Sequence, residues 1–175
     1  NIPNLTLYIF LSICLLPFTG LAQDFELTDA WAFKNEGGQK EDEVTGVVTD
    51  SQGNVYITGY FSGTINLDPD GADGGRLTSV DNNTDAGDVN TDIFVAKYGA
   101  DGKLIRAIPL DYKGYNDRAN NIALSNDGTL VYVVGQARGE SGVDDDIYVA
   151  LLNSNLDFQK NIQSASPELE RASNV

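Results

Sequence analysis

The sequence predicts an all-β protein: a partial β-propeller of about two four-stranded blades, part of a larger ring. A turn-and-strand pattern, D-S-Q-G-N-V-Y-I-T-G-Y-F at Asp50–Phe61, returns as N-D-G-T-L-V-Y-V-V-G at Asn126–Gly135. The neighbouring strand patterns return with it in the same order, which indicates a repeat protein. The strand interiors are apolar on both faces, as is typical of strands covered on both sides. A β-sandwich, the alternative fold, needs a polar outer face on most strands.

The first unit contains four strand patterns. Asp50 and Gly53 supply turn chemistry before the second of them, and Gly59 predicts a bulge or a close approach by another backbone. Pro109 confines the fourth strand to a sheet edge, since proline cannot donate to the ladder. The expected strands cover residues 43–50, 55–58 before the interruption at Gly59, 92–98 and 103–110.

The second unit repeats this series. Asp117–Leu124 matches Asp42–Thr49. Leu130–Gly135 matches Val55–Gly59 after a one-residue insertion, and Asp146–Leu152 matches Asp92–Tyr98. A turn into a fourth strand follows at Asn153–Phe158. Arg171–Val175 resembles Arg118–Ile122 and predicts the start of a third unit. We therefore place blade one at about residues 31–106, blade two at about 107–160 and the start of a third at 161–175, all within a domain at 23–175.

The N-terminal segment is apolar and contains no Asp, Glu, Lys or Arg between residues 1 and 22. Pro17 and Gly20 precede small residues that suit cleavage before Gln23, so we predict a signal peptide at 1–22 and a secreted or cell-surface protein. An uncleaved membrane anchor is the alternative. Because the chain begins at Asn1 without methionine and a third unit begins near Val175, we expect it to be a fragment.

The charge and the cysteine content narrow the classes of partner. The chain has 26 acidic and 11 basic residues, a formal net charge of −15. A surface this acidic repels phosphate backbones and anionic lipid, so we predict no nucleic-acid partner and no membrane insertion after signal cleavage. Cys14, the single cysteine, lies in the predicted signal, so the mature chain must be held together by packing without disulfides.

The first unit carries an acidic insert that the second lacks. It contains Asp68, Asp70, Asp73, Asp81, Asp85 and Asp88 among several glycines. Carboxylates on a supple loop are ligands that calcium prefers, so calcium is the one cofactor we name, with Asp68, Asp70 and Asp73 as its ligands. Ala72 and the missing distal glutamate depart from the EF-hand pattern, and a solvated loop is the alternative. Asp144–Asp146 is a second acidic run, whose alternative role is to protect a strand edge.

Catalytic chemistry has little support in the sequence. The chain has no histidine, which excludes Ser-His-Asp and Cys-His nucleophiles and His-ligated zinc from these residues. We predict no catalytic residue and no cofactor-binding residue. Among the aromatic residues, Tyr112 and Tyr115 are expected to lie in a loop, where a ligand surface is most often found.

Three strings carry a resemblance to a known family. They are D-x-x-G-N-V-Y-I-T-G-Y-F-S-G-T from Asp50, N-L-D-P-D-G from Asn66, and D-I-F-V-A-K-Y-x-A-D-G-K-L from Asp92. Together they resemble the SBBP, or beta-propeller, repeat of secreted bacterial proteins of the Bacteroidetes type. The second unit departs from it at Ser125 and Leu151, and Arg106 stands where the family usually has a tryptophan. The resemblance implies a propeller and a secreted location, and it brings no shared catalytic residues.

We therefore expect a secreted, non-catalytic propeller scaffold that binds an extracellular protein or glycan or serves in cell-surface display. The alternative is the N-terminal part of a propeller enzyme that acts on extracellular polysaccharide, with acids on several blades. Two blades cannot close a ring, so we also expect apolar blade faces to be exposed, and the isolated chain to self-associate.

Overall fold

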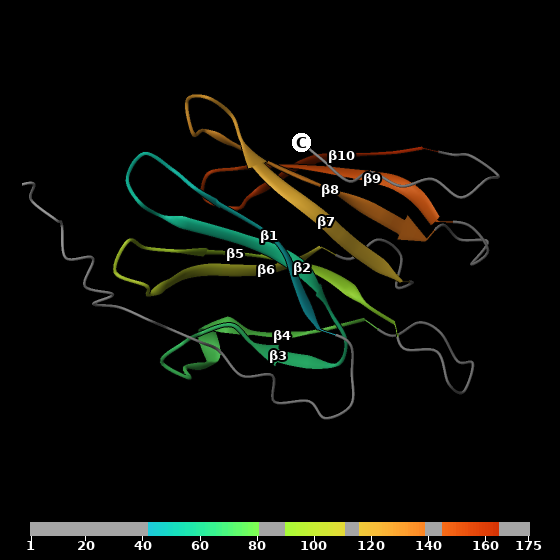
Figure 1. Ribbon diagram of the computed structural model, residues 1–175. Coiled ribbons are helices and arrows are strands. Elements are labelled where there is room, and N and C mark those ends of the chain that lie inside the picture. The colour runs from blue at the N-terminus through green and yellow to red at the C-terminus, as the bar shows by residue number, and fades with distance from the viewer. Residues whose placement is uncertain (1–41, 81–89, 111–115, 139–144, 165–175) are drawn as a thin grey trace, which may run out of the picture.

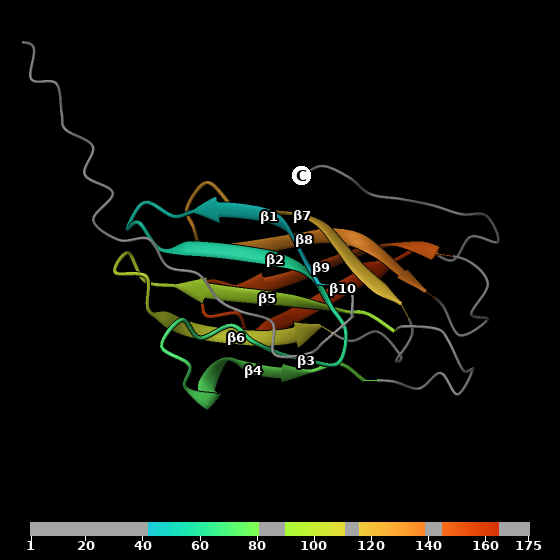
Figure 2. The same cartoon turned by 60° about the horizontal axis from the view of Figure 1, so that its bottom comes forward.

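The structure is a computed structural model, and it describes residues 42–80, 90–110, 116–138 and 145–164. Nearly every element in these residues is a β-strand, and three layers lie one upon another (Figures 1 and 2). A four-stranded sheet forms the middle layer, a second four-stranded sheet covers one of its faces, and a two-stranded hairpin covers the other. None of the described residues forms a helix long and apolar enough to cross a membrane.

The two large sheets are antiparallel meanders in which neighbours in space are neighbours along the chain, apart from one insert. Blade one has the order β1-β2-β5-β6 and blade two the order β7-β8-β9-β10. Their strands are β1 (Glu43–Thr49), β2 (Val55–Phe61), β5 (Asp92–Tyr98), β6 (Leu104–Leu110), β7 (Asp117–Leu124), β8 (Leu130–Arg138), β9 (Asp145–Asn153) and β10 (Phe158–Gln163). The prediction of an all-β partial propeller with two four-stranded blades is confirmed, and Pro109 lies on an edge strand as expected.

The third layer is a difference from the sequence-based expectation. The first part of the acidic insert contains a hairpin of β3 (Thr64–Asn66) and β4 (Arg76–Thr78), whose connection ends in a 3₁₀ turn η1 (Asp73–Gly75). Within this connection, residues 70–74 are exposed. Ile65, Leu67 and Leu77 are buried against blade one. Each three-residue strand carries only one buried hydrophobic residue, which is too little alternation for a sequence pattern to reveal.

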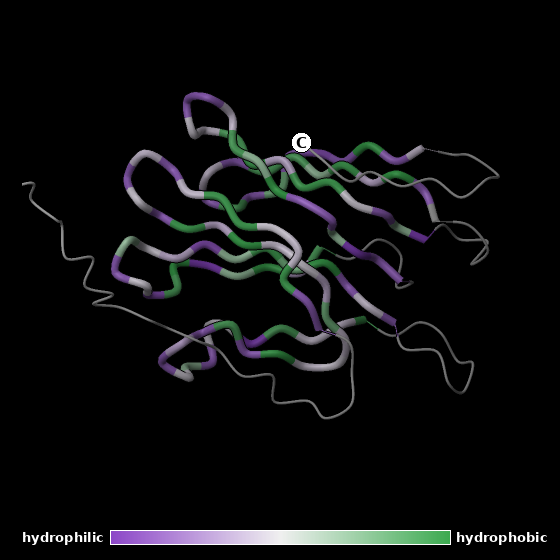
Figure 3. Tube along the Cα trace, viewed as in Figure 1, coloured by the Kyte–Doolittle hydropathy of each residue, from purple (hydrophilic) through white to green (hydrophobic). Residues whose placement is uncertain are grey.

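The middle sheet is buried on both faces because it has a neighbour on each side. Tyr56, Ile93 and Val95 belong to the core that blade one shares with blade two. Phe94 and Tyr98 belong to a separate core between blade one and the hairpin. All seven residues of β5 are buried, which explains why its sequence shows no polar face. Figure 3 shows the result as hydrophobic stretches along the strands of both blades.

Two glycines mark the same position in the two blades. A Cβ on Gly59 would lie 1.8 Å from the Glu43 carbonyl oxygen, and a Cβ on Gly135 would lie 2.1 Å from the Arg118 carbonyl oxygen. In both blades the facing first strand has an irregular register at that point, between Val44 and Gly46 in β1 and at the matching place in β7. The predicted close approach is therefore confirmed, and the bulge lies in the strand opposite the glycine.

The pairing of the strands also shows where the one-residue insertion of the second unit lies. Gly59 pairs with Phe94 in blade one, and Gly135 pairs with Tyr148 in blade two. Counting back from these pairs, Tyr56 corresponds to Tyr132, so the two strands match without a gap. The extra residue lies in the turn before β8 instead of in the strand, which corrects the alignment made from the sequence.

The blades are closest at their first strands. A Cβ on Gly46 of β1 would lie 3.0 Å from the backbone nitrogen of Ile122 in β7, so a larger residue here would require β7 to shift slightly. At the other side of the interface, β6 and β10 leave a groove of about 570 Å³. The interface is therefore tight at the first strands and open at the last, which is the wedge shape that arranges blades about an axis.

The turn between β9 and β10 docks blade two onto blade one. Leu156 is fully buried in the core shared by the two blades. The Lys97 Nζ donates a hydrogen bond to the Ser154 carbonyl oxygen at 2.9 Å and lies 5.0 Å from the centre of the Tyr56 ring. Nη1 of Arg106 donates to the Asn155 carbonyl oxygen at 2.9 Å. Charged donors from blade one thus satisfy carbonyl groups of a blade-two turn.

Candidate functional site: the groove between the inner turns

Asp50 organises the turn between β1 and β2. Its Oδ1 accepts hydrogen bonds from the backbone N–H groups of Gln52 and Asn54, both at 2.9 Å. Its Oδ2 accepts from the Asn54 side-chain amide at 2.8 Å and from the Tyr56 hydroxyl at 3.3 Å. Gly53 has a positive φ of 81°, which the turn requires. The turn chemistry predicted for Asp50 and Gly53 is present, with Asn54 as an additional partner.

Asp127 has the matching role in the turn between β7 and β8. Its Oδ1 accepts hydrogen bonds from the Ser125 hydroxyl at 2.5 Å and from the Thr129 hydroxyl at 2.8 Å. The Thr129 backbone N–H also donates to it at 3.1 Å. Gly128 adopts a φ of 69° in this turn, as Gly53 does in the first. Each turn therefore holds one carboxylate, but at different positions: Asp50 corresponds to Ser125, and Asp127 corresponds to Gln52.

These hydrogen bonds keep both carboxylates ionised. The Ser125 hydroxyl, with the backbone and hydroxyl of Thr129, lowers the pKa of Asp127 to about 2. Desolvation raises the pKa of Asp50, but the hydrogen bonds from Asn54, Gln52 and Tyr56 outweigh it and leave that pKa below its ordinary value. Both side chains are therefore fixed hydrogen-bond acceptors at neutral pH.

The turn between β1 and β2 and the turn between β7 and β8 are named the inner turns, and a groove of about 470 Å³ lies between them. Its walls are the turn of blade one and the turn of blade two, and its apolar part comes from β1 and β7. The lining residues are Val47, Val48, Thr49, Asp50, Ser51, Ile122, Ala123, Leu124, Ser125, Asn126, Asp127 and Gly128. Val47 is 64% exposed. Hydroxyl, amide and carboxylate groups thus surround an accessible apolar surface on a rigid scaffold, which is the composition of a ligand site.

The three predicted calcium ligands lie in the hairpin layer, away from this groove. Oδ1 of Asp68 accepts a hydrogen bond from the backbone N–H of Asp70 at 3.0 Å, and Asp73 pairs with Nε of Arg76 at 3.4 Å. Asp73 therefore has a basic partner close by in the chain. In the four described segments, no three carboxylates or other metal ligands gather in a way that suits a metal ion. Calcium binding by Asp68, Asp70 and Asp73 stays a prediction.

Other residues singled out in the sequence have structural roles or fall outside the described segments. The Asp146 carboxylate is mostly buried and accepts a hydrogen bond from the Gln163 side chain at 2.8 Å. Tyr56, Phe61, Phe94, Tyr98 and Tyr148 are core residues. The residues outside the description are Tyr112, Tyr115, Asp81, Asp85, Asp88 and Asp144.

Sequence reasoning did not identify the groove, although it identified both turns. The sequence pattern predicts Asp50 and Gly53 as turn residues and the second turn as their repeat. The sequence pattern does not show that β1 and β7 lie side by side. This contact places two turns, 75 residues apart in the sequence, on either side of one groove. The glycine at position 46 is the one local signal of that approach.

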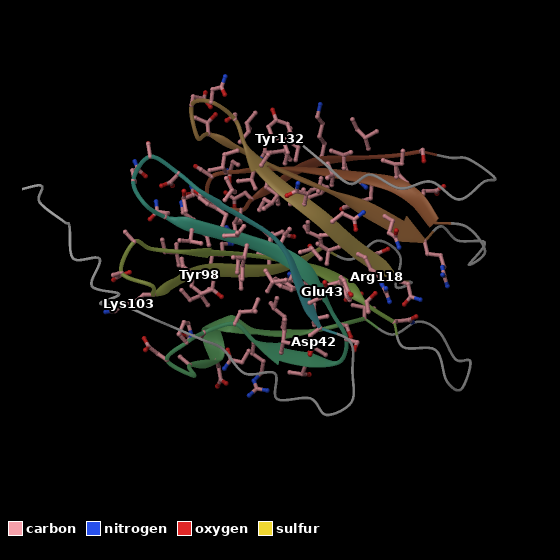
Figure 4. All side chains as sticks on the ribbon, in the orientation of Figure 1. Asp42, Glu43, Tyr98, Lys103, Arg118 and Tyr132 are labelled. Atoms are coloured by element: carbon pink, nitrogen blue, oxygen red, sulfur yellow. The ribbon has the colours of Figure 1, made fainter. Side chains whose placement is uncertain are left out.

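One end of the blades carries a further polar cluster, which Figure 4 labels in part. The Arg118 guanidinium lies 4.7 Å from the centre of the Tyr60 ring, and the Tyr60 hydroxyl donates to a Glu43 carboxylate oxygen. Oδ1 of Asp42 accepts from the backbone N–H of Ser62, and Oδ1 of Asp117 accepts from that of Arg138. Asp42 and Asp117 are therefore equivalent structural residues of the two blades.

The comparison with known families agrees with this geometry. Residues 36–63 match the model of a family described as the beta-propeller repeat, SBBP. The matched segment includes β1, the turn held by Asp50, and β2 with Gly59. Among curated proteins, no significant match to the chain is found. The first blade of this chain therefore contains a segment that matches the beta-propeller repeat, and the two blades form part of a propeller.

Proposed function

We propose that this chain is a secreted, non-catalytic propeller scaffold that binds an extracellular ligand or displays one at the cell surface, with the groove between the inner turns as the binding site. The groove is the observation that carries the proposal. Two turns from different repeats meet there, and each presents an anchored carboxylate beside free hydroxyl or amide groups. Residues that a rigid scaffold holds on its turns are the usual place for recognition.

The groove chemistry favours a neutral glycan as the ligand. Asp50 and Asp127 supply ionised acceptors for sugar hydroxyl groups, and the Ser51 and Asn126 side chains are exposed beside them. Val47, which is 64% exposed, and the half-buried Leu124 offer apolar surface for the carbon face of a sugar ring. An anionic ligand is disfavoured because both fixed charges in the groove are negative and the chain carries a net charge of −15.

The pKa values support binding over acid catalysis. A glycosidase needs one carboxylic acid whose pKa is raised so that it can donate a proton. Asp50 and Asp127 have lowered pKa values instead, and so does Asp157, through the Asn153 side chain and Arg106. The enzyme alternative is therefore not the one we propose for this groove.

An array of neutral oligosaccharides, probed with the labelled chain, tests the proposal. Ser51→Trp and Asn126→Trp fill the groove from opposite walls, and each is expected to reduce any array signal at least about tenfold, since tenfold corresponds to only 1.4 kcal/mol of binding free energy. Gln159→Trp, on the exposed face of β10, is the matched control and should leave the signal unchanged. No signal above background, or equal loss in all three variants, contradicts a glycan site in the groove.

Secretion is tested separately. Expression of the chain with its N-terminal segment in a secreting host, followed by N-terminal sequencing, is expected to give a product that begins at Gln23. Retention of residues 1–22 in the membrane fraction contradicts the signal peptide and favours the anchor.

A further inference from the structure

The two blades present corresponding faces to different neighbours. Because Gly59–Phe94 and Gly135–Tyr148 are equivalent pairs, the face of blade one that meets the hairpin corresponds to the face of blade two that meets blade one. The hairpin-facing residues of blade one are Ile57, Phe94, Ala96 and Tyr98, and their counterparts are Val133, Tyr148, Ala150 and Leu152. The hairpin therefore covers the face on which blade one would otherwise pack against a preceding blade.

The hairpin fills this position with a true core. Leu67 is 1% exposed, and the Tyr98 hydroxyl, itself buried, donates a hydrogen bond to the Leu67 carbonyl oxygen at 2.8 Å. Phe61 and Phe94 lie beneath the hairpin with ring centres 6.3 Å apart in an edge-to-face arrangement. Figure 4 shows Tyr98 between the middle sheet and the hairpin layer. The expectation that blade one exposes an apolar face to solvent is therefore wrong over β2 and β5.

The other end of the stack has no such cover among the described strands. In blade one, Tyr56, Ile93 and Val95 pack against blade two. Their counterparts in blade two are Tyr132, Ile147 and Val149, which lie on its outer face. Ile162 on the same face is 63% exposed. Figures 1 and 2 show this face on the side of the molecule opposite the hairpin. One end of the blade stack is closed and the other has the composition of a blade interface.

We propose that the β3–β4 hairpin is a cap that prevents head-to-tail assembly of this chain. Without the hairpin, the uncovered face of blade one in one copy can pack against the outer face of blade two in another copy. The two faces correspond to those that already pack against each other between the blades of one chain. Such a contact is heterologous: it joins copies head to tail, into a ring where the rotation between blades closes and into an open filament where it does not. Terminal units with a distinct outer cover solve the same problem in other repeat architectures.

Replacing the insert tests the proposal in the full chain. Residues 63–90 are exchanged for the shorter sequence of residues 139–144, which connects the corresponding strands of blade two. Light scattering and sedimentation are expected to show that the average mass of this variant rises steadily with concentration. The parent chain, measured at the same concentrations, is expected to give a smaller average mass than the variant.

A second substitution distinguishes specific head-to-tail assembly from nonspecific aggregation. Val149→Lys, on the outer face of blade two, should return the hairpin-exchanged chain to the mass of the parent, whereas Ile105→Lys, at an exposed position of β6, should not. Assembly that survives Val149→Lys, or a folded hairpin-exchanged chain that stays monomeric, overturns the proposal.

A milder variant covers the case in which the exchanged chain does not fold. Leu67→Ser combined with Leu77→Ser leaves the chain length unchanged and removes the two leucines that anchor the hairpin. Loss of hydrogen-exchange protection at residues 64–78, together with at least about tenfold tighter self-association, supports the cap. Loss of protection without a change in self-association contradicts it.

Discussion

Leu156 occupies in blade two the turn position that Gly102 occupies in blade one. Both residues have a positive φ, 62° for Leu156 and 78° for Gly102. Both donate the equivalent turn hydrogen bond, to the Asn153 carbonyl oxygen and the Gly99 carbonyl oxygen respectively, at 2.9 Å. A leucine in this conformation costs roughly 1–2 kcal/mol. Its complete burial between the blades is the compensating gain.

Leu156→Gly is therefore expected to destabilise the chain although it removes backbone strain. Truncation of a buried leucine costs about 2–5 kcal/mol, which exceeds the strain that is relieved. We expect a net loss of about 1–3 kcal/mol in urea unfolding. Gly102→Leu is the control: it adds the strain in blade one, at a position that is not part of either core. A Leu156→Gly chain as stable as the parent would mean that the turn does not anchor the blades.

Lys97 and Arg106 contact the same turn, but we expect them to contribute differently to the free energy of unfolding. Lys97 is 9% exposed and donates to the Ser154 carbonyl oxygen, so Lys97→Met is expected to cost about 1–3 kcal/mol. Arg106 pairs with Asp157 at 2.6 Å, but both side chains are about half exposed, so Arg106→Met is expected to cost under about 1 kcal/mol. Urea unfolding of the two variants measures the difference, and the reverse ranking would contradict the role given to Lys97.

Gly59→Ala should be among the most damaging small substitutions in blade one. The added Cβ would lie 1.8 Å from the Glu43 carbonyl oxygen and 2.8 Å from the Phe94 ring, so the β1–β2 ladder has to shift. We expect a loss of about 2 kcal/mol or more in thermal or urea unfolding. Gly74→Ala is the matched control, because nothing lies within 4 Å of its added Cβ. Equal stability of the two variants would show that the ladder accommodates the methyl group.

The turn carboxylates make the fold sensitive to acid. Asp127 has a pKa of about 2 in the folded chain against an ordinary value of 3.8, so its contribution is complete above about pH 4 and is lost as the pH falls towards 2. We expect the melting temperature of Asp127→Asn to fall less steeply over this range than that of the parent. Ser125→Ala removes the main cause of the lowered pKa and should flatten the profile in the same direction. Parallel profiles for all three chains would contradict this linkage.

Calcium binding at the insert is tested by titration calorimetry and by melting with and without calcium. If Asp68, Asp70 and Asp73 bind the ion, calcium raises the melting temperature, because a ligand that binds only the folded state stabilises it. Changing all three residues to asparagine then abolishes both the heat and the shift. Absence of heat and of any shift in the parent chain removes calcium from consideration.

The strands of the two blades, the repeat that relates them and the turn residues can all be predicted from the sequence, whereas the short strands β3 and β4 cannot. These features depend on neighbours along the chain: the apolar pattern of β5, the proline of an edge strand, and the Asp50 and Gly53 turn that returns in blade two. Each leaves a local pattern, because strand periodicity and positive φ angles are properties of a few consecutive residues.

Which surfaces of the described residues are covered depends on contacts that appear only in three dimensions. The hairpin cap depends on Leu67 meeting Tyr98, the buried turn on Leu156 reaching the core of the other blade, and the groove on Gly46 meeting Ile122. These contacts join residues 31 to more than 70 positions apart. Packing between such distant residues follows from shape and burial in three dimensions, and a single sequence carries no periodic signal for it.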